Sequence, residues 1–390
     1  PRARAARRRL TGPAPGTVPW RQLLGHPRID AHHPRPGAHD LALLQYTSGT
    51  TGRPRGAMLT HRNLESNARM GEQWVQPGPD ESIYAVLPLF HAYGMTLGLG
   101  IAIAIRARLV LFPTVDTDLL ARAMKRSRPT ILPAVPPVYR RLLEAAEERG
   151  VELRGIRYAV SGAMTLPRDL VAAWEERSEG FLVEGYGLTE CAPLVACNPL
   201  NAARRTGSIG VPFPSTEIRL VDPGTGADAA AGEPGELWVR GPQTFRGYWG
   251  DEEATRAAYS ADGWLRTGDL VRMDADGFLY VVDRLKEVII TGGFNVSPSE
   301  VEEALRDDDA VADAAVVGLP SPDGGEEVVA AVVTAPGAAF DERALRERCY
   351  AWLTRYKVPR RIVELERFPT SMLGKTLRRE VRALLEEREG

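Results

Sequence analysis

The sequence predicts an α/β fold, because short apolar runs of β type alternate with amphipathic helical segments. Runs of β type occur at residues 83–89, 109–112 and 156–160. Between the last two, residues 138–149 carry apolar side chains at helical spacing and are followed by Gly150, a common helix stop. Strands that alternate with helices in this way are typical of a sheet with helices packed against it.

The N-terminal residues 1–38 do not follow this pattern. They are rich in Arg, Pro and His and show no sustained periodicity, so we expect them to form a linker. Their basic run has no apolar core behind it, which does not indicate a secretory signal peptide. Because the sequence starts at Pro1, we expect it to begin inside a longer protein.

Two domains are expected after the linker, at residues 39–282 and 283–390. The first becomes strand-rich towards its end, where the segments 216–221, 236–240 and 278–282 are separated by Pro, Gly and Asp turns. The second returns to a mixed α+β pattern and is the smaller of the two.

One helix start in the second domain has strong local signals. Ser297 can cap the helix, Pro298 suits its first position, and Glu300 can complete a capping box. Val296 and Val301 are spaced to form a hydrophobic staple across the cap. We therefore expect a helix from Pro298 onward.

Composition indicates a soluble globular protein. The 390 residues are 44% hydrophobic and 26% charged, which allows more than one domain with a substantial core. A net charge of −2 gives no general attraction to nucleic acid, so no nucleic-acid partner is expected, whereas peripheral membrane contact stays open. Cys191, Cys197 and Cys349 have neither disulfide nor metal-ligand spacing, which favours a reducing, cytoplasmic setting.

The most apolar run covers residues 97–105 and ends at Arg106. It is well short of the ~20 residues that a membrane-spanning helix requires. We expect a pair of buried strands there and no transmembrane segment.

The most informative segment is YTSGTTGRPRG at residues 46–56, which follows the apolar run 41–44 and precedes a helix-like stretch. Small hydroxyl and glycine residues let backbone N–H groups approach phosphate oxygens, and the hydroxyls add further donors. The loop is not a Walker A loop, because GxxxxGK[ST] is absent. As a bare pattern such a string is usually an ordinary loop; in a phosphate site the binding residues would be Thr47, Ser48, Gly49, Thr50, Thr51, Gly52 and the basic Arg55.

Further motifs follow in order along the chain. They are PLFHAYG at 88–94, SGA at 161–163, GYGLTE at 185–190, TGD at 267–269, DRLKE at 283–287, GGFNV at 292–296 and LGKT at 373–376. With the phosphate loop, this series resembles the adenylate-forming superfamily of acyl-CoA synthetases, peptide-synthetase adenylation domains and luciferases. Lys and Arg together number 49, of which four are lysine, and two of those four, Lys286 and Lys375, lie where the family uses lysine.

The resemblance implies an ATP site. In the family the loop at 46–56 cradles the β- and γ-phosphates, and this chain has Arg55 where lysine is usual, so a guanidinium fork replaces a point charge. Tyr186 would stack on adenine, and Asp269 would accept hydrogen bonds from both ribose hydroxyls. The residues implied to line the nucleotide site are Ser161, Gly162, Ala163, Gly185, Tyr186, Gly187, Thr189 and Asp269.

The resemblance also implies a Mg²⁺ ion, an acyl substrate and CoA. Glu190 would help to hold Mg²⁺, a hard cation that prefers oxygen ligands. His91 would lie beside the acyl carboxylate, and the lack of an aspartate in PLFHAYGM disfavours an amino-acid substrate. Lys375 would bridge the acyl carboxylate and the transferring phosphoryl group.

The C-terminal domain would be mobile, with Asp283 as the hinge of its rotation. Arg284 would contact ribose or phosphate. Lys286, Gly292 and Gly293 would belong to the surface presented to CoA in the second half-reaction.

Within the superfamily, residues 39–385 look most like bacterial long-chain fatty-acid CoA ligases. This implies activation of a fatty acid to acyl-AMP and its transfer to CoA, which makes the protein an acid–thiol ligase. One alternative is a fatty acyl-AMP ligase that loads an acyl carrier protein. The other is an inactive remnant, since family members have a large region before the phosphate loop and the N-terminal domain is expected to be incomplete here.

Overall fold

The computed structural model describes residues 18, 20–25, 35–47, 54–291, 294–321, 325–371 and 374–388. The chain divides into two compact units, Pro1–Gly37 and Ala38–Gly390. In the first unit, the described residues include one short helix, α1 (Trp20–Leu24), inside the expected linker. The described part of the chain contains no helix that is both long and apolar enough to cross a membrane.

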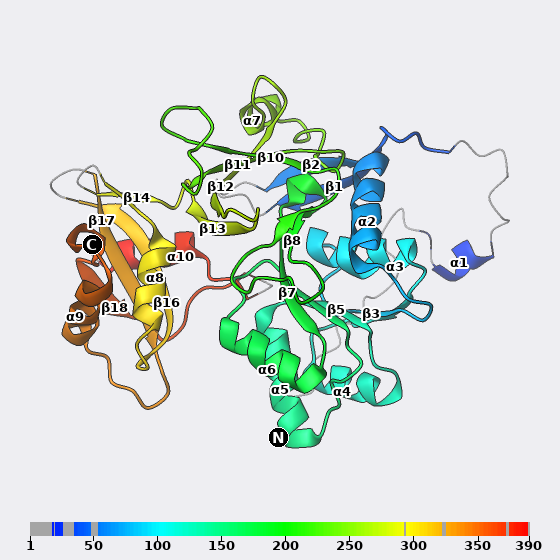
Figure 1. Cartoon of the computed structure of the whole chain (residues 1–390), viewed down its shortest axis with the longest axis horizontal. Coiled ribbons are helices and arrows are strands. Elements are labelled where there is room, and N and C mark those ends of the chain that lie inside the picture. Colours follow the sequence, from blue (N-terminus) through cyan, green and yellow to red (C-terminus); the bar gives the residue numbers. More distant parts are fainter. Residues whose placement is uncertain are drawn as a thin grey trace. The chain divides into compact units, whose positions relative to one another are not determined.

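A seven-stranded sheet forms the centre of the second unit (Figure 1). Its strand order is β4 (Arg108–Leu111), β3 (Ser82–Ala85), β5 (Ile131–Ala134), β6 (Tyr158–Ser161), β7 (Phe181–Gly187), β8 (Leu194–Cys197) and β9 (Val211–Pro212). The strands from β4 to β7 are parallel, and pairing becomes antiparallel from β7 to β8. The predicted α/β class is confirmed.

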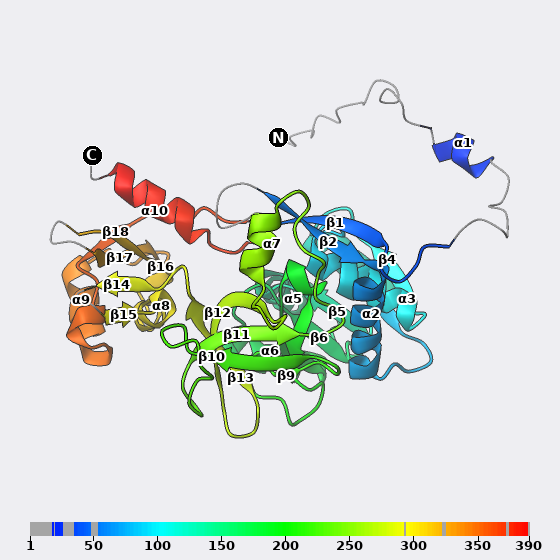
Figure 2. The same cartoon turned by 90° about the horizontal axis from the view of Figure 1, so that it is seen from above.

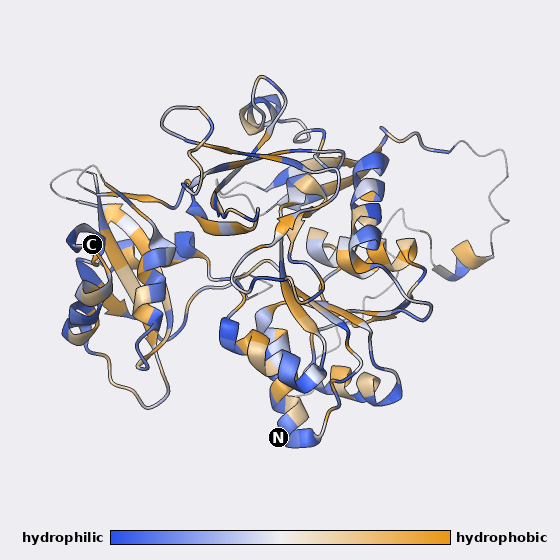
Figure 3. Cartoon of the chain, viewed as in Figure 1, coloured by the Kyte–Doolittle hydropathy of each residue, from blue (hydrophilic) through white to orange (hydrophobic). Residues whose placement is uncertain are grey.

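Helices connect the parallel strands and bury their apolar faces against the sheet. They are α4 (Thr117–Arg126), α5 (Pro136–Arg149) and α6 (Arg168–Ser178). Trp174 of α6 and Tyr139 of α5 are fully buried and meet edge to face with ring centroids 4.9 Å apart. The predicted helix at 138–149 is confirmed, and Gly150 ends it with a φ of +63°. Figure 3 shows hydrophilic exposed faces on α5 and α6.

The prediction of buried strands at residues 97–105 is wrong. These residues form the end of a π-helix, η1 (Gly94–Gly100), and the helix α3 (Ile101–Ala104). A short apolar run has no periodicity that separates a buried strand from a buried helix. Packing decides the outcome here: a Cβ on Gly71 of helix α2 (His61–Val75) would lie 2.4 Å from Ile101 Cδ1, so the glycine lets the two helices approach closely.

The described ends of the phosphate-loop segment lie on two paired strands. Strand β1 (Leu41–Thr47) pairs antiparallel with β2 (Arg55–Thr60), and Thr47 is opposite Arg55 in the register. The expected strand before the loop is therefore confirmed, but a second strand stands between the loop and the helix α2. Thr60 and Asn63 form a reciprocal capping box at the start of α2.

The expected strand-rich region is a four-stranded antiparallel sheet. Its strands are β10 (Glu217–Val221), β11 (Gly235–Arg240), β12 (Leu265–Met273) and β13 (Leu279–Arg284), in that order. Helix α7 (Glu252–Ala258) lies between β11 and β12 in the sequence. Buried residues of this sheet, including Leu237, Val271 and Leu279, form one apolar cluster with residues of β2 and β8.

The C-terminal segment has its own sheet of β16 (Val311–Pro320), β17 (Glu326–Thr334) and β18 (Arg361–Glu364). Side chains of β17 alternate between two apolar clusters, because successive residues of a strand point to opposite faces. Val328, Ala330 and Val332 lie in the cluster of α8 (Pro298–Arg306) and α9 (Glu342–Trp352). Val329 and Ala331 lie in the cluster of α10 (Arg378–Glu387), so helices cover both faces (Figure 2).

The remaining elements of this segment are the strands β14 (Ile289–Thr291) and β15 (Phe294–Val296) and the short 3₁₀ helix η3 (Arg355–Lys357). The α8 start matches its prediction in most details. Ser297 Oγ accepts a hydrogen bond from the Glu300 N–H, Pro298 is the first helical residue, and Val296 and Val301 are both fully buried in one cluster. The Glu300 carboxylate, however, binds Lys357 Nζ at 2.7 Å rather than completing a capping box.

Candidate active site

A cleft of about 1960 Å³ brings together residues from the central sheet, the strand-rich sheet and the C-terminal segment. Every predicted site residue that the structure describes lines this cleft. These residues are Thr47, Arg55, His91, Ser161, Gly162, Ala163, Gly185, Tyr186, Gly187, Thr189, Glu190, Asp269, Arg284, Lys286 and Lys375. Ser48, Gly49, Thr50, Thr51, Gly52, Gly292 and Gly293 lie outside the described residues.

Three of the motifs follow carboxyl ends of parallel strands. The segment with His91 follows β3, Ser161 ends β6, and Gly187 ends β7. The edge formed by these ends is where open α/β sheets bind ligands, notably where the strand order reverses. Here the order reverses between β3 and β5, because β4 lies on one side of β3 and β5 lies on the other.

Close packing explains the small residues at this edge. A Cβ on Gly187 would lie 2.0 Å from the Pro193 carbonyl oxygen, so no larger residue fits without a backbone shift. Ala163 has a φ of +67°, an unusual conformation for a residue with a side chain. The Ser161 hydroxyl is fully buried and has no hydrogen-bond partner within the described chain. A buried orphan hydroxyl beside the cleft is compatible with a polar ligand there.

Asp269 is the centre of a polar group on the strand-rich side. It lies opposite Arg284 in the pairing of β12 and β13, and Arg284 Nε donates to Asp269 Oδ1 at 3.2 Å. The Tyr186 hydroxyl donates to Asp269 Oδ2. Burial, followed by the Asp269 charge, holds the pKa of Tyr186 well above its usual value, so the phenol remains a donor. The carboxylate is thereby oriented towards the cleft that it lines.

Glu190 belongs to the short 3₁₀ helix η2 (Thr189–Cys191) that follows β7. Tyr248 donates to Glu190 Oε1 at 2.6 Å, and burial together with this carboxylate raises the pKa of Tyr248. The described residues contain no cluster of three or more His, Cys, Asp or Glu that could enclose a metal. A single carboxylate suits Mg²⁺ that keeps waters and ligand phosphates as its other partners, so the donor set fits the expected ion.

Arg55 flanks the expected phosphate loop. Its Nε lies 3.3 Å from Asp251 Oδ2, and its guanidinium carbon lies 5.5 Å from the centroid of the Tyr248 ring. The sequence predicts Arg55 as a cation for phosphate but gives no signal for Asp251 or Tyr248. Both partners orient the guanidinium beside the hairpin of β1 and β2.

His91 is held as a neutral imidazole. The Tyr93 N–H donates to His91 Nδ1 at 3.2 Å, which assigns the ring proton to Nε2. Burial lowers the pKa of His91 below its ordinary value. The neighbouring Phe90 carbonyl accepts a bond of 2.6 Å from Gln45 Nε2, which ties this segment to β1. His91 therefore offers a neutral N–H donor to the cleft.

Lys375 stands in a tight loop closed by a bridge between Thr370 and Thr376. The Ser371 N–H donates to the Lys375 carbonyl at 2.8 Å, and the Lys375 N–H donates to Ser371 Oγ at 3.1 Å. Gly374 allows the turn with a φ of +84°. Desolvation by the surrounding protein, and next the charge of Arg284, lowers the pKa of Lys375.

Lys286 is exposed on the segment that joins β13 to β14. Asp283, expected as a hinge residue, is buried, and its Oδ2 accepts bonds from Ser297 Oγ at 2.6 Å and from the Ser299 N–H at 2.9 Å. Arg378 also binds this carboxylate, at 3.4 Å. Sequence reasoning missed Arg378, because nothing local links it to a residue so distant in the chain.

Two family models match this chain. The AMP-binding enzyme model matches residues 7–249, and the AMP-binding enzyme C-terminal domain model matches residues 300–375. A long-chain-fatty-acid–CoA ligase of Bacillus subtilis is 40% identical over 370 residues, covering 94% of this chain and 64% of the ligase. A feruloyl-CoA synthase of Amycolatopsis is 38% identical and covers 89% of this chain and 70% of the synthase. The chain thus spans less than two thirds of the Bacillus ligase.

Solved structures give the same result for the fold. The crystal structure of ATP-bound MatB from Rhodopseudomonas palustris matches with a TM-score of 0.84 and 32% identity, over 91% of this chain and 70% of that one. The o-succinylbenzoate CoA synthetase of Bacillus subtilis, in complex with its acyl-adenylate intermediate, matches with a TM-score of 0.79 and 30% identity, over 89% and 70%. These similarities confirm the expected multi-subdomain adenylate-forming fold.

Proposed function

The chain belongs to the AMP-binding enzyme family, and we propose that it joins a long-chain fatty acid to CoA through an acyl-adenylate. The observation that carries this proposal is the convergence of all described candidate site residues on one cleft. Residues as distant in sequence as His91, Asp269 and Lys375 share its walls. The similarity to long-chain-fatty-acid–CoA ligases supports the substrate class.

In the first step, an oxygen of the acyl carboxylate attacks the α-phosphorus of ATP. The bond from this phosphorus to the bridging oxygen breaks, and pyrophosphate leaves with that electron pair. Lys375 balances the negative charge shared by the carboxylate and the phosphoryl group. Such a reaction depends on positioning and charge stabilisation rather than on a protein nucleophile.

The other cleft residues orient the two substrates. Asp269 accepts hydrogen bonds from the ribose hydroxyls, and Tyr186 stacks on the adenine. His91, as a neutral donor at Nε2, hydrogen-bonds the acyl carboxylate. Glu190 would hold Mg²⁺, which would supply positive charge beside the phosphates.

An apolar part of the same cleft suits the acyl chain. Trp74 and Val75 of α2, Leu97 of η1 and Ile101 of α3 line it, together with Leu194 and Phe213. None of these side chains is charged, so an alkyl chain would lose no polar contact on entering. The helical form of residues 97–105 places part of this apolar wall close to α2.

In the second step, the CoA sulfur attacks the acyl carbonyl of the adenylate. The bond from this carbon to the AMP oxygen breaks, AMP leaves, and the thiol proton passes to solvent. We propose that rotation of residues 283–390 about Asp283 separates the two steps, moving Lys375 away and bringing Lys286 towards CoA. A cytoplasmic setting, where CoA is reduced, agrees with the three free cysteines.

ATP–pyrophosphate exchange with a panel of acids tests the proposal. Exchange with C12–C18 fatty acids, and poor exchange with ferulate or amino acids, is the expected result. Exchange with ferulate alone would contradict a fatty-acid substrate and indicate an aromatic acid instead. A folded protein that binds ATP but exchanges with no acid would support the remnant alternative, and transfer to a holo-carrier protein instead of CoA would support a carrier-loading ligase.

A further inference from the structure

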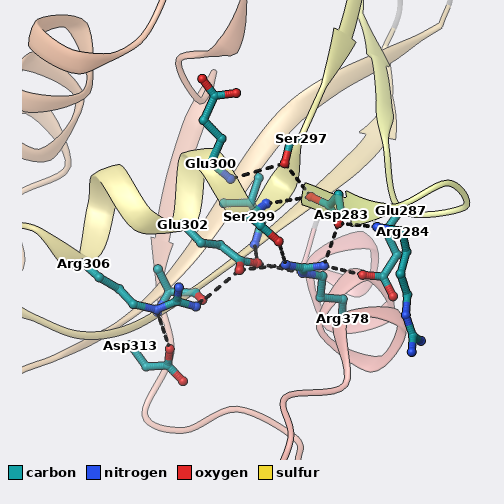
Figure 4. Close-up of polar contacts among 12 residues, drawn as sticks. Asp283, Arg284, Glu287, Ser297, Ser299, Glu300, Glu302, Arg306, Asp313 and Arg378 are labelled. Carbon is teal, nitrogen blue, oxygen red and sulfur yellow. Dashed lines mark hydrogen bonds and ion pairs between the residues drawn. The ribbon is translucent and has the colours of Figure 1, made fainter. Parts of the chain in front are cut away.

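Arg378 is the first residue of α10 and follows Lys375 by three positions. Figure 4 shows its guanidinium between Glu302 of α8 on one side and Asp283 and Glu287 on the other. Its Nη1 binds Glu287 and lies 3.4 Å from Asp283 Oδ1. Its Nε and Nη2 bind the two oxygens of Glu302 at 2.7 and 2.8 Å, and Nη2 also binds Ser299 Oγ at 2.8 Å.

The carboxylates that Arg378 joins are removed from solvent. The side chains of Asp283 and Glu302 are 1% and 6% exposed, and that of Glu287 is 27% exposed. A buried carboxylate without a cation is strongly unfavourable. The guanidinium of Arg378 is therefore fixed in place by its ion pairs with all three carboxylates. Arg306 adds a second cation for Glu302, at 3.3 Å, and backbone N–H groups donate to Asp283 and Glu302 as well.

The same contacts connect two regions of the proposed active site. Asp283 and Glu287 flank Arg284, which binds Asp269. At the other end, Arg378 lies directly after the bridge that closes the Lys375 loop. The guanidinium thus ties the Lys375 loop to the segment that carries a partner of Asp269.

We propose that Arg378 is a positioning residue for Lys375, whose fork of donors fastens the Lys375 loop to Asp283, Glu287 and Glu302 for adenylate formation. This inference depends on the proposed function, since it assigns Lys375 to that half-reaction. A lysine at position 378 would keep the charge but lose the planar fork, so it could not engage all three carboxylates in these directions. A positive charge at position 378 is therefore not sufficient, and the planar guanidinium is required.

Arg382 provides a matched control. It lies one turn later on the same helix and binds Glu326 at 3.4 Å and Glu386 at 3.0 Å, so its removal takes the same charge from α10. Neither partner contacts Asp283 or Glu287 among the described contacts. The full chain is compared with Arg378→Lys, Arg378→Ala and Arg382→Ala.

The first readout separates the half-reactions. In Arg378→Lys, ATP–pyrophosphate exchange is expected to fall by roughly 100-fold, the scale of a misplaced reacting group, whereas thioester formation from supplied acyl-AMP falls far less. Arg378→Ala should lose more exchange, and Arg382→Ala should keep both activities within about twofold. Equal loss of both half-reactions in folded Arg378→Lys would overturn the proposal and leave Arg378 a structural residue.

The second readout does not need activity. Lys375 is labelled with acetic anhydride across a pH series, and peptide mass spectrometry follows it against the exposed Lys125 of α4. Arg378→Ala should move the Lys375 labelling midpoint to higher pH, because a neighbouring cation is lost and carboxylates are freed, whereas Arg382→Ala should not. An unchanged profile in Arg378→Ala would contradict the positioning role. Wild-type protein without exchange activity would reject the proposed function, while the labelling shift would still decide the placement of Lys375.

Discussion

Arg284 lies directly opposite Asp269 on neighbouring antiparallel strands, and its Nε donates a hydrogen bond of 3.2 Å to Asp269 Oδ1. This pair joins β12 of the strand-rich sheet to the end of β13, where residues 283–390 begin. Together with the Tyr186 hydroxyl it orients the Asp269 carboxylate at the cleft. The pair therefore links the proposed ribose site with the start of the C-terminal segment.

Asp269→Asn should weaken ATP binding without unfolding the protein. Hydrogen bonds to a charged group contribute about 1.5–3 kcal/mol, so the KM for ATP should rise roughly 10- to 100-fold. Steady-state exchange kinetics at saturating acid measure this change. Tyr186→Phe is the control, since it keeps the ring but removes one donor to Asp269, and its effect should be smaller. An unchanged KM in Asp269→Asn would remove Asp269 from the ribose site.

Glu190→Gln should raise the Mg²⁺ concentration required for half-maximal exchange, because an amide oxygen is a weaker ligand for a hard cation than a carboxylate. Tyr248→Phe removes a hydrogen bond to Glu190 but leaves its charge, so its Mg²⁺ requirement should change less. Titration of exchange activity with Mg²⁺ at fixed ATP compares them. The same Mg²⁺ dependence in Glu190→Gln and wild type would exclude the ligand role.

The loss of ATP–pyrophosphate exchange activity at alkaline pH should follow the deprotonation of Lys375. Burial first, and then Arg284 and Arg378, lower the pKa of Lys375, whereas Glu287 and Asp269 raise it. Because the protonated ammonium is the active form, activity should fall as pH rises through a pKa below the ordinary 10.5. Glu287→Gln removes a charge that raises this pKa, so the loss of activity should move to lower pH. A loss of activity that moves to higher pH in this variant would contradict the assignment.

Trp174→Ala should destabilise the central sheet, because Trp174 is fully buried and packs on Tyr139. Loss of a buried aromatic side chain costs about 3–5 kcal/mol of unfolding free energy. Trp352, which is 68% exposed, is the matched control, and Trp352→Ala should cost far less. Urea unfolding followed by circular dichroism compares the two. Similar midpoints would indicate that α6 does not pack as the structure shows.

The sequence predicted those features of the fold that depend on residues close together in the chain. The helix that ends at Gly150 and the start of α8 were accessible because caps, proline and glycine act within a few residues. The motif series was accessible through its resemblance to the adenylate-forming superfamily, and only the phosphate loop also has a local physical reason, since small residues let backbone approach phosphate. The cleft shows these strings converging, which sequence order alone does not reveal.

Contacts between distant residues were not accessible. Nothing near Arg378 in sequence indicates that it binds Asp283, and nothing near Tyr248 indicates Glu190. Residues 97–105 were predicted as strands because apolar character without periodicity does not specify a conformation, and the close approach of Gly71 and Ile101 that accommodates a helix is tertiary. The Glu300 side chain, which was predicted to bond back to the helix start, likewise binds a residue distant in sequence, Lys357.

The central claim is that Lys375 serves adenylate formation at this cleft, and Lys375→Ala tests it most directly. Two rates are measured on the same folded preparation: ATP–pyrophosphate exchange with a long-chain fatty acid, and thioester formation from supplied acyl-AMP and CoA. The account predicts that exchange is abolished while thioester formation is retained. Equal loss of both rates, or full retention of exchange, would contradict it.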